Sequence, residues 1–164
     1  MTTTSLAKVA ADPDGRRAVA ELFTEPDFFF RSTIPDLLCA AELHALVPGD
    51  ALLCRRGARP AGLIWFEPVA AGYPAHFQLH VRFSRACGTE VAAEATRRAL
   101  RELAAGRPLH RISHEVGAAD RCGVDLAGAL GLDLEGAVPD LVAAGGGRGP
   151  RNYYAKLYRE HEDA

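Results

Sequence analysis

The sequence predicts a single α/β domain in which helices flank a mixed sheet. Apolar residues recur at helical spacing in some segments, and short apolar or alternating runs lie between them. The segments follow the order helices, strands, helix, strand, helix and hairpin, which is typical of helices packed on a mixed sheet. A chain of 164 residues is long enough to bury one core.

Composition and charge exclude several classes of protein. Apolar residues make up 48% and charged residues 24%, as in ordinary globular proteins. The formal net charge of −2 gives no nucleic-acid footprint, so no nucleic-acid partner is expected. No apolar run is long enough to span a bilayer, and the N-terminus has no apolar signal segment. We therefore expect a cytoplasmic protein without a membrane partner. The cysteine spacing matches no zinc or redox motif.

The first half of the chain predicts a tail, two helices and a strand pair. Residues 1–12 are expected to form a flexible tail, followed by one domain over residues 13–164. Candidate caps and apolar spacing then predict the helices, and apolar runs joined by a turn predict the strands. The expected elements are helices over 16–23 and 32–46 and strands over 51–55 and 61–69.

Residues 75–83 predict a half-buried central strand, because polar and apolar side chains alternate over eight residues. One face carries His76, Gln78, His80 and Arg82, and the other carries Phe77, Leu79, Val81 and Phe83. A long helix is expected next, over 89–105, since apolar residues recur at every fourth position and Gly106 ends the pattern. The remaining elements are a strand over 109–116, a helix over 120–131, and a hairpin of 132–143 and 151–159 around a glycine-rich turn.

Four strings in this order resemble the GNAT acetyltransferase superfamily. They are RPAGLIWFEPV, LHRISHEV, LAGALGLDLEGAVPD and RNYYAKLYRE, and together they extend the resemblance over nearly the whole chain. The resemblance implies a mixed, mostly antiparallel sheet flanked by helices. It also implies that the strands at 75–83 and 109–116 lie side by side, run parallel and splay apart at their carboxyl ends.

The loop before the long helix resembles the coenzyme A (CoA) motif of that family, Q/R-x-x-G-x-G/A, in a degenerate form. Arg85 and Gly88 keep the first two positions, but Glu90 replaces the third. Backbone N–H groups of such a loop bind pyrophosphate. A glutamate there either repels the cofactor or serves as a first-turn acid of its own helix. By resemblance, the residues expected to contact acetyl-CoA or another acyl thioester are Val81, Phe83, Arg85, Gly88, Thr89, Glu90 and Asp120.

Two further positions depart from the family. Asp120 stands where the family has an asparagine, and Ala127 stands where many relatives place a tyrosine that protonates the leaving thiolate. The resemblance therefore implies a CoA site with added negative charge and without its usual general acid.

The central strand supplies the candidate catalytic groups. His76 and His80 share its polar face, and His114 and Glu115 lie on the adjacent strand. In the family this region borders the acyl and acceptor channel, and a histidine pKa near neutrality suits proton removal from an amine. A solvated sheet face or buried core histidines would give the same pattern. The histidines carry no metal-binding signature, so no metal is expected.

Three functions are compatible with these residues. The first is an acyltransferase that moves an acyl group from acyl-CoA or an acyl carrier protein to the amine of a small molecule or peptide. The second is a repurposed enzyme, such as a lyase, cyclase or decarboxylase, that uses the strand histidines without acetyl-CoA. The third is a non-catalytic binding protein. The sequence does not distinguish a monomer from a homodimer.

Overall fold

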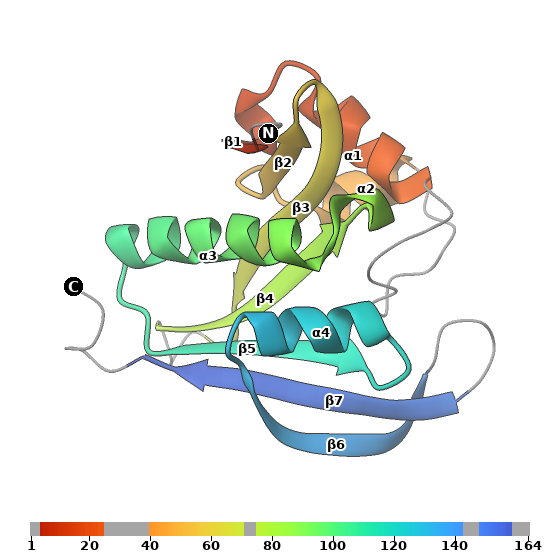
Figure 1. Cartoon of the computed structure of the whole chain (residues 1–164). Helices are drawn as coiled ribbons and strands as arrows, with labels where there is room; N and C mark the ends of the chain where they lie inside the picture. Colours follow the sequence, from red (N-terminus) through yellow and green to blue (C-terminus); the bar gives the residue numbers. More distant parts are fainter. Residues whose placement is uncertain (1–3, 25–39, 71–74, 143–147, 159–164) are drawn as a thin grey trace.

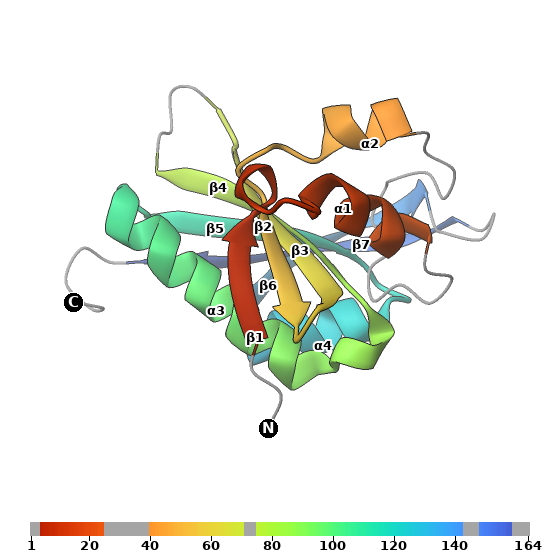
Figure 2. The ribbon, with the colours of Figure 1, turned by 90° about the horizontal axis from the view of Figure 1, so that it is seen from above.

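The protein is built on one seven-stranded sheet, seen in a computed structural model that describes residues 4–24, 40–70, 75–142 and 148–158. The strand order is β1-β2-β3-β4-β5-β7-β6. In Figure 2, α1 and α2 lie on one side of the sheet, and α3 and α4 lie on the other. The elements are β1 (Thr4–Lys8), a 3-10 turn (Val9–Ala11), α1 (Gly15–Thr24), α2 (Ala40–Leu46), β2 (Leu52–Arg56), β3 (Arg59–Pro68), β4 (His76–Phe83), a second 3-10 turn (Arg85–Cys87), α3 (Thr89–Gly106), β5 (Arg111–Gly117), α4 (Arg121–Ala129), β6 (Asp133–Val142) and β7 (Arg148–Leu157).

The strand pairing confirms the expected mixed sheet. β4 and β5 are parallel neighbours, and the other neighbouring strands pair antiparallel. The parallel register covers only three positions, from His76↔Arg111 to Gln78↔Ser113. Beyond Gln78 the two strands separate (Figure 1). The splayed parallel pair predicted from the family resemblance is therefore present.

The expectation of a flexible tail is wrong for residues 4–12. Thr4–Lys8 forms edge strand β1, which pairs antiparallel with β2 along its whole length. Val9 follows with a buried side chain, and the Asp12 carboxylate accepts two hydrogen bonds from the Arg55 guanidinium at 2.8 and 2.9 Å. The strand has a weak sequence pattern because most of its side chains are exposed, so its order comes from ladder hydrogen bonds to β2.

Other expected elements differ mainly at their ends. The turn between β2 and β3 is shorter than the sequence suggests, because only Gly57 and Ala58 separate the strands and Gly57 takes a positive φ of 63°. Of the helix expected over 32–46, residues 32–39 lie outside the described residues, as do 143–147 of the expected hairpin. The remaining strand and helix expectations are confirmed within a few residues.

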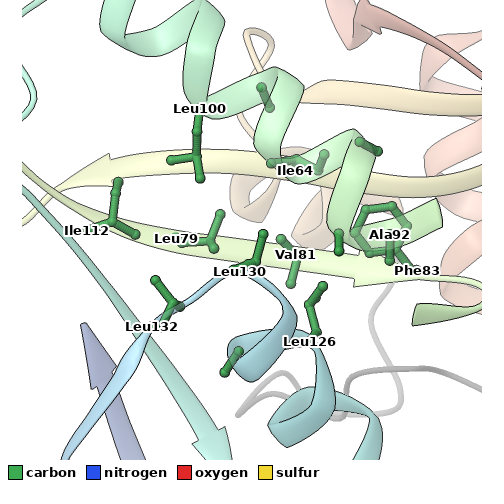
Figure 3. Close-up of a cluster of buried hydrophobic side chains, with 14 of the residues drawn as sticks. Ile64, Leu79, Val81, Phe83, Ala92, Leu100, Ile112, Leu126, Leu130 and Leu132 are labelled. Carbon is green, nitrogen blue, oxygen red and sulfur yellow. The ribbon is translucent and has the colours of Figure 1, made fainter. Parts of the chain in front are cut away.

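The larger core lies between the sheet and helices α3 and α4. Figure 3 shows β4 contributing Leu79, Val81 and Phe83 to this cluster, with Leu100 of α3 above and Leu126 of α4 below. Alanines fill the inner stripe of α3, so the helix lies close to the strands. Gly62 of β3 faces the Phe83 ring so closely that a Cβ there would lie 2.1 Å from Phe83 Cδ1. The ring thus occupies the space where a side chain of residue 62 would be.

A smaller core lies on the opposite side, under α1. Its buried members include Val19 and Leu22 of α1 and Leu63 and Trp65 of β3. The polar phase of β4 is on this same side of the sheet, because Trp65 pairs directly with His80 across the β3–β4 ladder. His76, His80 and Arg82 therefore lie on the α1 side, opposite α3 and α4.

Candidate functional site

The candidate site is the gap that opens where β4 and β5 separate. The last paired residues are Gln78 and Ser113, and the next carbonyl of β4, Leu79 O, bonds to the side chain of His114 at 2.9 Å. In a strand the N–H and C=O of one residue point to the same neighbour. Since the Leu79 carbonyl points toward β5, the backbone groups of Val81 and Phe83 point the same way, into the gap.

Two helices begin at the open end of this gap. α3 follows β4 and α4 follows β5, and Figure 1 shows both helices starting at the end where the strands have separated. The first-turn N–H groups of a helix have no intrahelical acceptors and carry partial positive charge. Gly88 precedes α3 with a φ of 75°, and a Cβ built there would meet nothing within 4 Å. The approach to the α3 N-terminus at Gly88 is thus open.

Thr89 and Glu90 form the first turn of α3, and the Glu90 side chain is exposed. The N-cap residue of this helix is Gly88, which has no side chain to accept a hydrogen bond from the first-turn N–H groups. The carboxylate therefore lies in the first turn, where its charge is favourable to the helix dipole. The same position brings a negative charge close to any anion that binds the first-turn N–H groups.

His80 lies between an aromatic ring and a carboxylate on the α1 side of the gap. Its imidazole stacks on the Trp65 indole with ring centroids 4.9 Å apart and planes inclined by 8°. Its Nε2 lies 3.1 Å from Glu67 Oε2. Burial lowers the pKa of His80, while the charges of Glu67 and Glu115 raise it in part. The imidazole is therefore mainly neutral at neutral pH and has a nitrogen lone pair available for a proton.

His76 belongs to a hydrogen-bonded cluster at the closed end of the gap. Its Nε2 lies 3.0 Å from Ser113 Oγ, and that hydroxyl donates to Gln78 Oε1 at 2.8 Å. Burial and the nearby Arg111 guanidinium lower the pKa of His76. These contacts link β4 to β5 at the last paired positions, directly before the strands separate.

His114 lies on the other face of the sheet from His76 and His80. Its strand neighbours Ile112 and Val116 belong to the core under α3 and α4, and His114 itself is only 3% exposed. Burial lowers its pKa to about 4, with a small contribution from the charge of His80. A neutral imidazole that bonds Leu79 O through Nδ1 must carry its proton on that atom. Beyond the last paired residues, the His114 side chain thus hydrogen-bonds the Leu79 carbonyl of β4 in place of a backbone N–H of β5.

Glu115 returns to the α1 side and pairs with Arg151 of β7, with an N–O distance of 2.9 Å. The structure therefore brings together His76, His80 and Glu115 on one face, and it places His114 behind them. Among the described residues, no group of three or more histidine, cysteine, aspartate or glutamate side chains is arranged to hold a metal ion.

Comparisons of the sequence and of the fold give different results. The sequence matches no protein-family model and no curated protein. The fold matches an N-acetyltransferase from Staphylococcus aureus Mu50 with a TM-score of 0.77 at 10% identity, covering 94% of this chain and 98% of that one. The chain has the GNAT acetyltransferase fold.

Two other GNAT structures indicate the chemistry that this fold supports elsewhere. An acetyltransferase from Salmonella typhimurium that modifies the N-terminal serine of ribosomal protein L7/L12 matches with a TM-score of 0.74 at 13% identity, covering 97% of each chain. The microcin C7 self-immunity acetyltransferase MccE, solved with acetyl-CoA and AMP, matches with a TM-score of 0.71 at 12% identity, covering 94% of this chain and 92% of that one.

Two departures from the GNAT motifs have structural explanations. Asp120 is the N-cap residue of α4, and its carboxylate accepts a hydrogen bond from the Gly123 N–H at 3.1 Å. Burial raises the pKa of Asp120, and the α4 backbone N–H groups oppose that rise. Ala127 is fully buried in the core under α4. The Asp120 carboxylate thus caps its own helix, and the Ala127 side chain is part of the core packing of α4.

Sequence reasoning missed three residues of the site, which are Trp65, Glu67 and Ser113. Trp65 and Glu67 occupy alternate positions of β3, so their shared face was readable from the sequence. Their contact with His80 depends on the β3–β4 register, which pairs Trp65 with His80 and Glu67 with Gln78.

Within the described helices, none is long and apolar enough to cross a membrane.

Proposed function

We propose that the protein is an N-acyltransferase that transfers an acyl group from an acyl thioester to the amine of a small molecule or peptide. Acetyl-CoA is the donor we favour, and an acyl carrier protein is a related donor with a single phosphodiester. The observation that carries the proposal is the gap between β4 and β5, with the α3 N-terminus at its open end and neutral His80 beside it.

The residues around the gap fit a thioester donor. The backbone of Val81 and Phe83 offers strand-like hydrogen bonds, whereas their side chains are buried. Gly88 and the backbone at Arg85 form the turn before α3, and Thr89 begins the helix, where N–H groups favour a phosphate. When bound, the donor would supply an activated acyl carbon and a thiol leaving group. Glu90 is the one residue of this set that opposes an anionic donor.

His80 is the group we assign to proton transfer. An attacking amine must lose a proton as its nitrogen forms the new N–C bond and the C–S bond of the donor breaks. The neutral imidazole of His80 accepts that proton. Ala127 has no acidic group, so the departing thiolate takes its proton from solvent. Burial lowers the pKa of His114 to about 4, so we assign this residue to the strand geometry, through its hydrogen bond to Leu79 O, and not to proton transfer.

The α1 side of the sheet offers the acceptor surface. Trp65 and His80 form a stacked aromatic pair, and the Glu67 carboxylate next to them is 65% exposed. Such a surface attracts a cationic amine and contacts its apolar part. The Salmonella typhimurium relative acts on a protein N-terminus, so a peptide amine is one acceptor class to test beside small amines.

Two observations favour a second function. Glu90 is exposed at the turn where a donor phosphate would bind, and Ala127 removes the usual acid. A protein of this fold that does not use CoA would tolerate both. Its chemistry would then depend on His80 or on the His76–Ser113 pair, as in a lyase, cyclase or decarboxylase, or it would bind a ligand without catalysis.

Binding and turnover separate these alternatives. Acetyl-CoA at 100 times its dissociation constant should stabilise the protein by about 2.7 kcal/mol in a thermal-shift assay. Thiol release should then be measured with a panel of small amines and short peptides. His80→Ala should reduce release roughly 10²–10⁴-fold, while Glu102→Gln, on the exposed face of α3, should not change it. An absence of stabilisation at millimolar acetyl-CoA, together with no thiol release, would favour the second function.

A further inference from the structure

A carboxylate on the neighbouring strand, that of Glu67, contacts one ring nitrogen of His80. Glu67 lies on β3 and His80 on β4, two positions apart along the ladder, because Glu67 pairs with Gln78. Glu67 Oε2 is 3.1 Å from His80 Nε2. A catalytic role for this contact rests on the proposed function, whereas the contact itself is a feature of the structure.

An ionised carboxylate can only accept hydrogen bonds, so the proton in this contact must belong to His80 Nε2. A neutral imidazole carries one proton, and its other nitrogen then holds the lone pair. The Trp65 indole, stacked at an inclination of 8°, holds the plane of the ring. Ring plane and proton position are therefore set by two residues of the same strand.

We propose that Glu67 is a positioning residue that holds His80 with its proton on Nε2, so that Nδ1 is the atom that accepts the proton of the attacking amine. Glu67 does not itself take that proton. Trp65 limits the ring to a plane, and Glu67 selects the tautomer within it.

The charges around His80 come from three strands. Glu67 on β3 and Glu115 on β5 raise its pKa, and burial lowers it. Arg82, on the same face of β4, directs its guanidinium to the Phe23 ring of α1, at 3.6 Å from the ring centroid. Glu115 is engaged by Arg151. Among these groups Glu67 is the one that hydrogen-bonds His80, so its removal should change the titration of His80 most.

The test reads the imidazole directly by nitrogen NMR. The protein has six histidines, and loss of one signal in His80→Gln assigns His80. In the wild-type protein at pH 8, we expect a protonated Nε2 and an unprotonated Nδ1. In Glu67→Gln the negative charge is lost, so the pKa of His80 should fall. Glu102→Gln is the matched control and should leave His80 unchanged, because it removes a carboxylate that pairs with Arg98 on the exposed face of α3.

Kinetics provide the second readout if the chain acylates an amine. Glu67→Gln should lower kcat about tenfold, which is less than the 10²–10⁴-fold loss expected on removing the base itself. KM for the donor should stay the same, and the acidic limb of the pH profile should move to lower pH with the NMR pKa. Glu67→Asp keeps the charge and should restore part of kcat. Each of these changes follows from the position of one carboxylate.

Three results would overturn the inference, two from NMR and one from kinetics. One NMR result is a wild-type spectrum with the His80 proton on Nδ1, and the other is a Glu67→Gln variant whose His80 titrates at the wild-type pH. If no acyl transfer is found with any donor, the proposed function fails, but the NMR results still decide the role of Glu67. A kcat loss without any change in pH profile would also count against a positioning role.

Discussion

Gly62→Ala tests whether Phe83 packs on the β3 backbone as the structure describes. The added Cβ would lie 2.1 Å from Phe83 Cδ1, 2.5 Å from Cε1 and 2.8 Å from Cγ. Ordinary contacts begin near 3.4 Å. The nearest ring atom would thus have to move by about 1.3 Å to reach ordinary contact, although the ring is fully buried. Overpacking of this kind costs about 1–3 kcal/mol of stability.

The same geometry predicts a rescue. Phe83→Leu removes Cε1 and the rigid ring plane, and the shorter side chain can rotate away from the new Cβ. Its own cost should lie below the roughly 3–5 kcal/mol of a Phe→Ala change. In the double variant the two costs should not add, and a favourable coupling of about 0.5–3 kcal/mol is expected. Urea denaturation of the four proteins, read by circular dichroism, gives this coupling from the unfolding free energies.

A matched substitution separates crowding from a general glycine effect. Gly128 lies in α4, and a Cβ built there would meet nothing within 4 Å. Gly128→Ala should therefore be neutral or stabilising by up to about 1 kcal/mol, because alanine has the higher helix propensity. If Gly62→Ala is as mild as Gly128→Ala, or if its cost adds to that of Phe83→Leu, the described packing of Phe83 is wrong.

Three further outcomes are expected. His114 titrates at about 4 when folded, below its ordinary 6.5, so the unfolded chain binds the proton first. The contribution of neutral His114 to the unfolding free energy is therefore full above pH 6.5 and should fall by about 3 kcal/mol as the pH drops toward 4. Urea denaturation across this pH range should show a smaller fall in His114→Asn. Glu90→Gln should tighten acetyl-CoA binding about fivefold at low salt and less at high salt, by titration calorimetry; equal affinities would leave Glu90 as a helix acid only. Deletion of residues 2–8 should lower the melting temperature, because β2 loses its ladder to β1; an unchanged melting temperature would show that this ladder adds no stability.

The sequence predicts elements well where one face of a segment is buried. β4 is the clearest example, because its alternation separates Leu79 and Val81 from His76 and His80, and the structure keeps that division. β1 has no such pattern, since an exposed edge strand takes its order from the pairing of its backbone. Alternation over 109–116 also separates His114 from Glu115, so their opposite faces were predictable from the sequence.

Contacts between strands needed the register, which no pattern within one strand supplies. Glu67 and His80 are thirteen residues apart, and they meet only because β3 and β4 pair Trp65 with His80. A shift of that register by one residue would turn every side chain of β3 to the other face. The candidate base was therefore predictable from the sequence, and the residue that orients it was not.

The three departures from the family pattern, one in the CoA loop and two in or next to α4, are not of one kind. Asp120 has a carboxylate that accepts a hydrogen bond from the Gly123 N–H at the α4 N-terminus, so this group already has a partner. Ala127 is fully buried, which makes it part of the packing of α4. Glu90 alone combines an exposed carboxylate with a place in the first turn beside Gly88. The argument for a weakened CoA site therefore depends on Glu90 by itself. An exposed charge is screened by water and salt, so the expected effect of Glu90 on acetyl-CoA affinity is several-fold and not a complete loss. That magnitude is compatible with an acyltransferase that works at high donor concentration, and it makes the salt dependence of acetyl-CoA binding the decisive measurement.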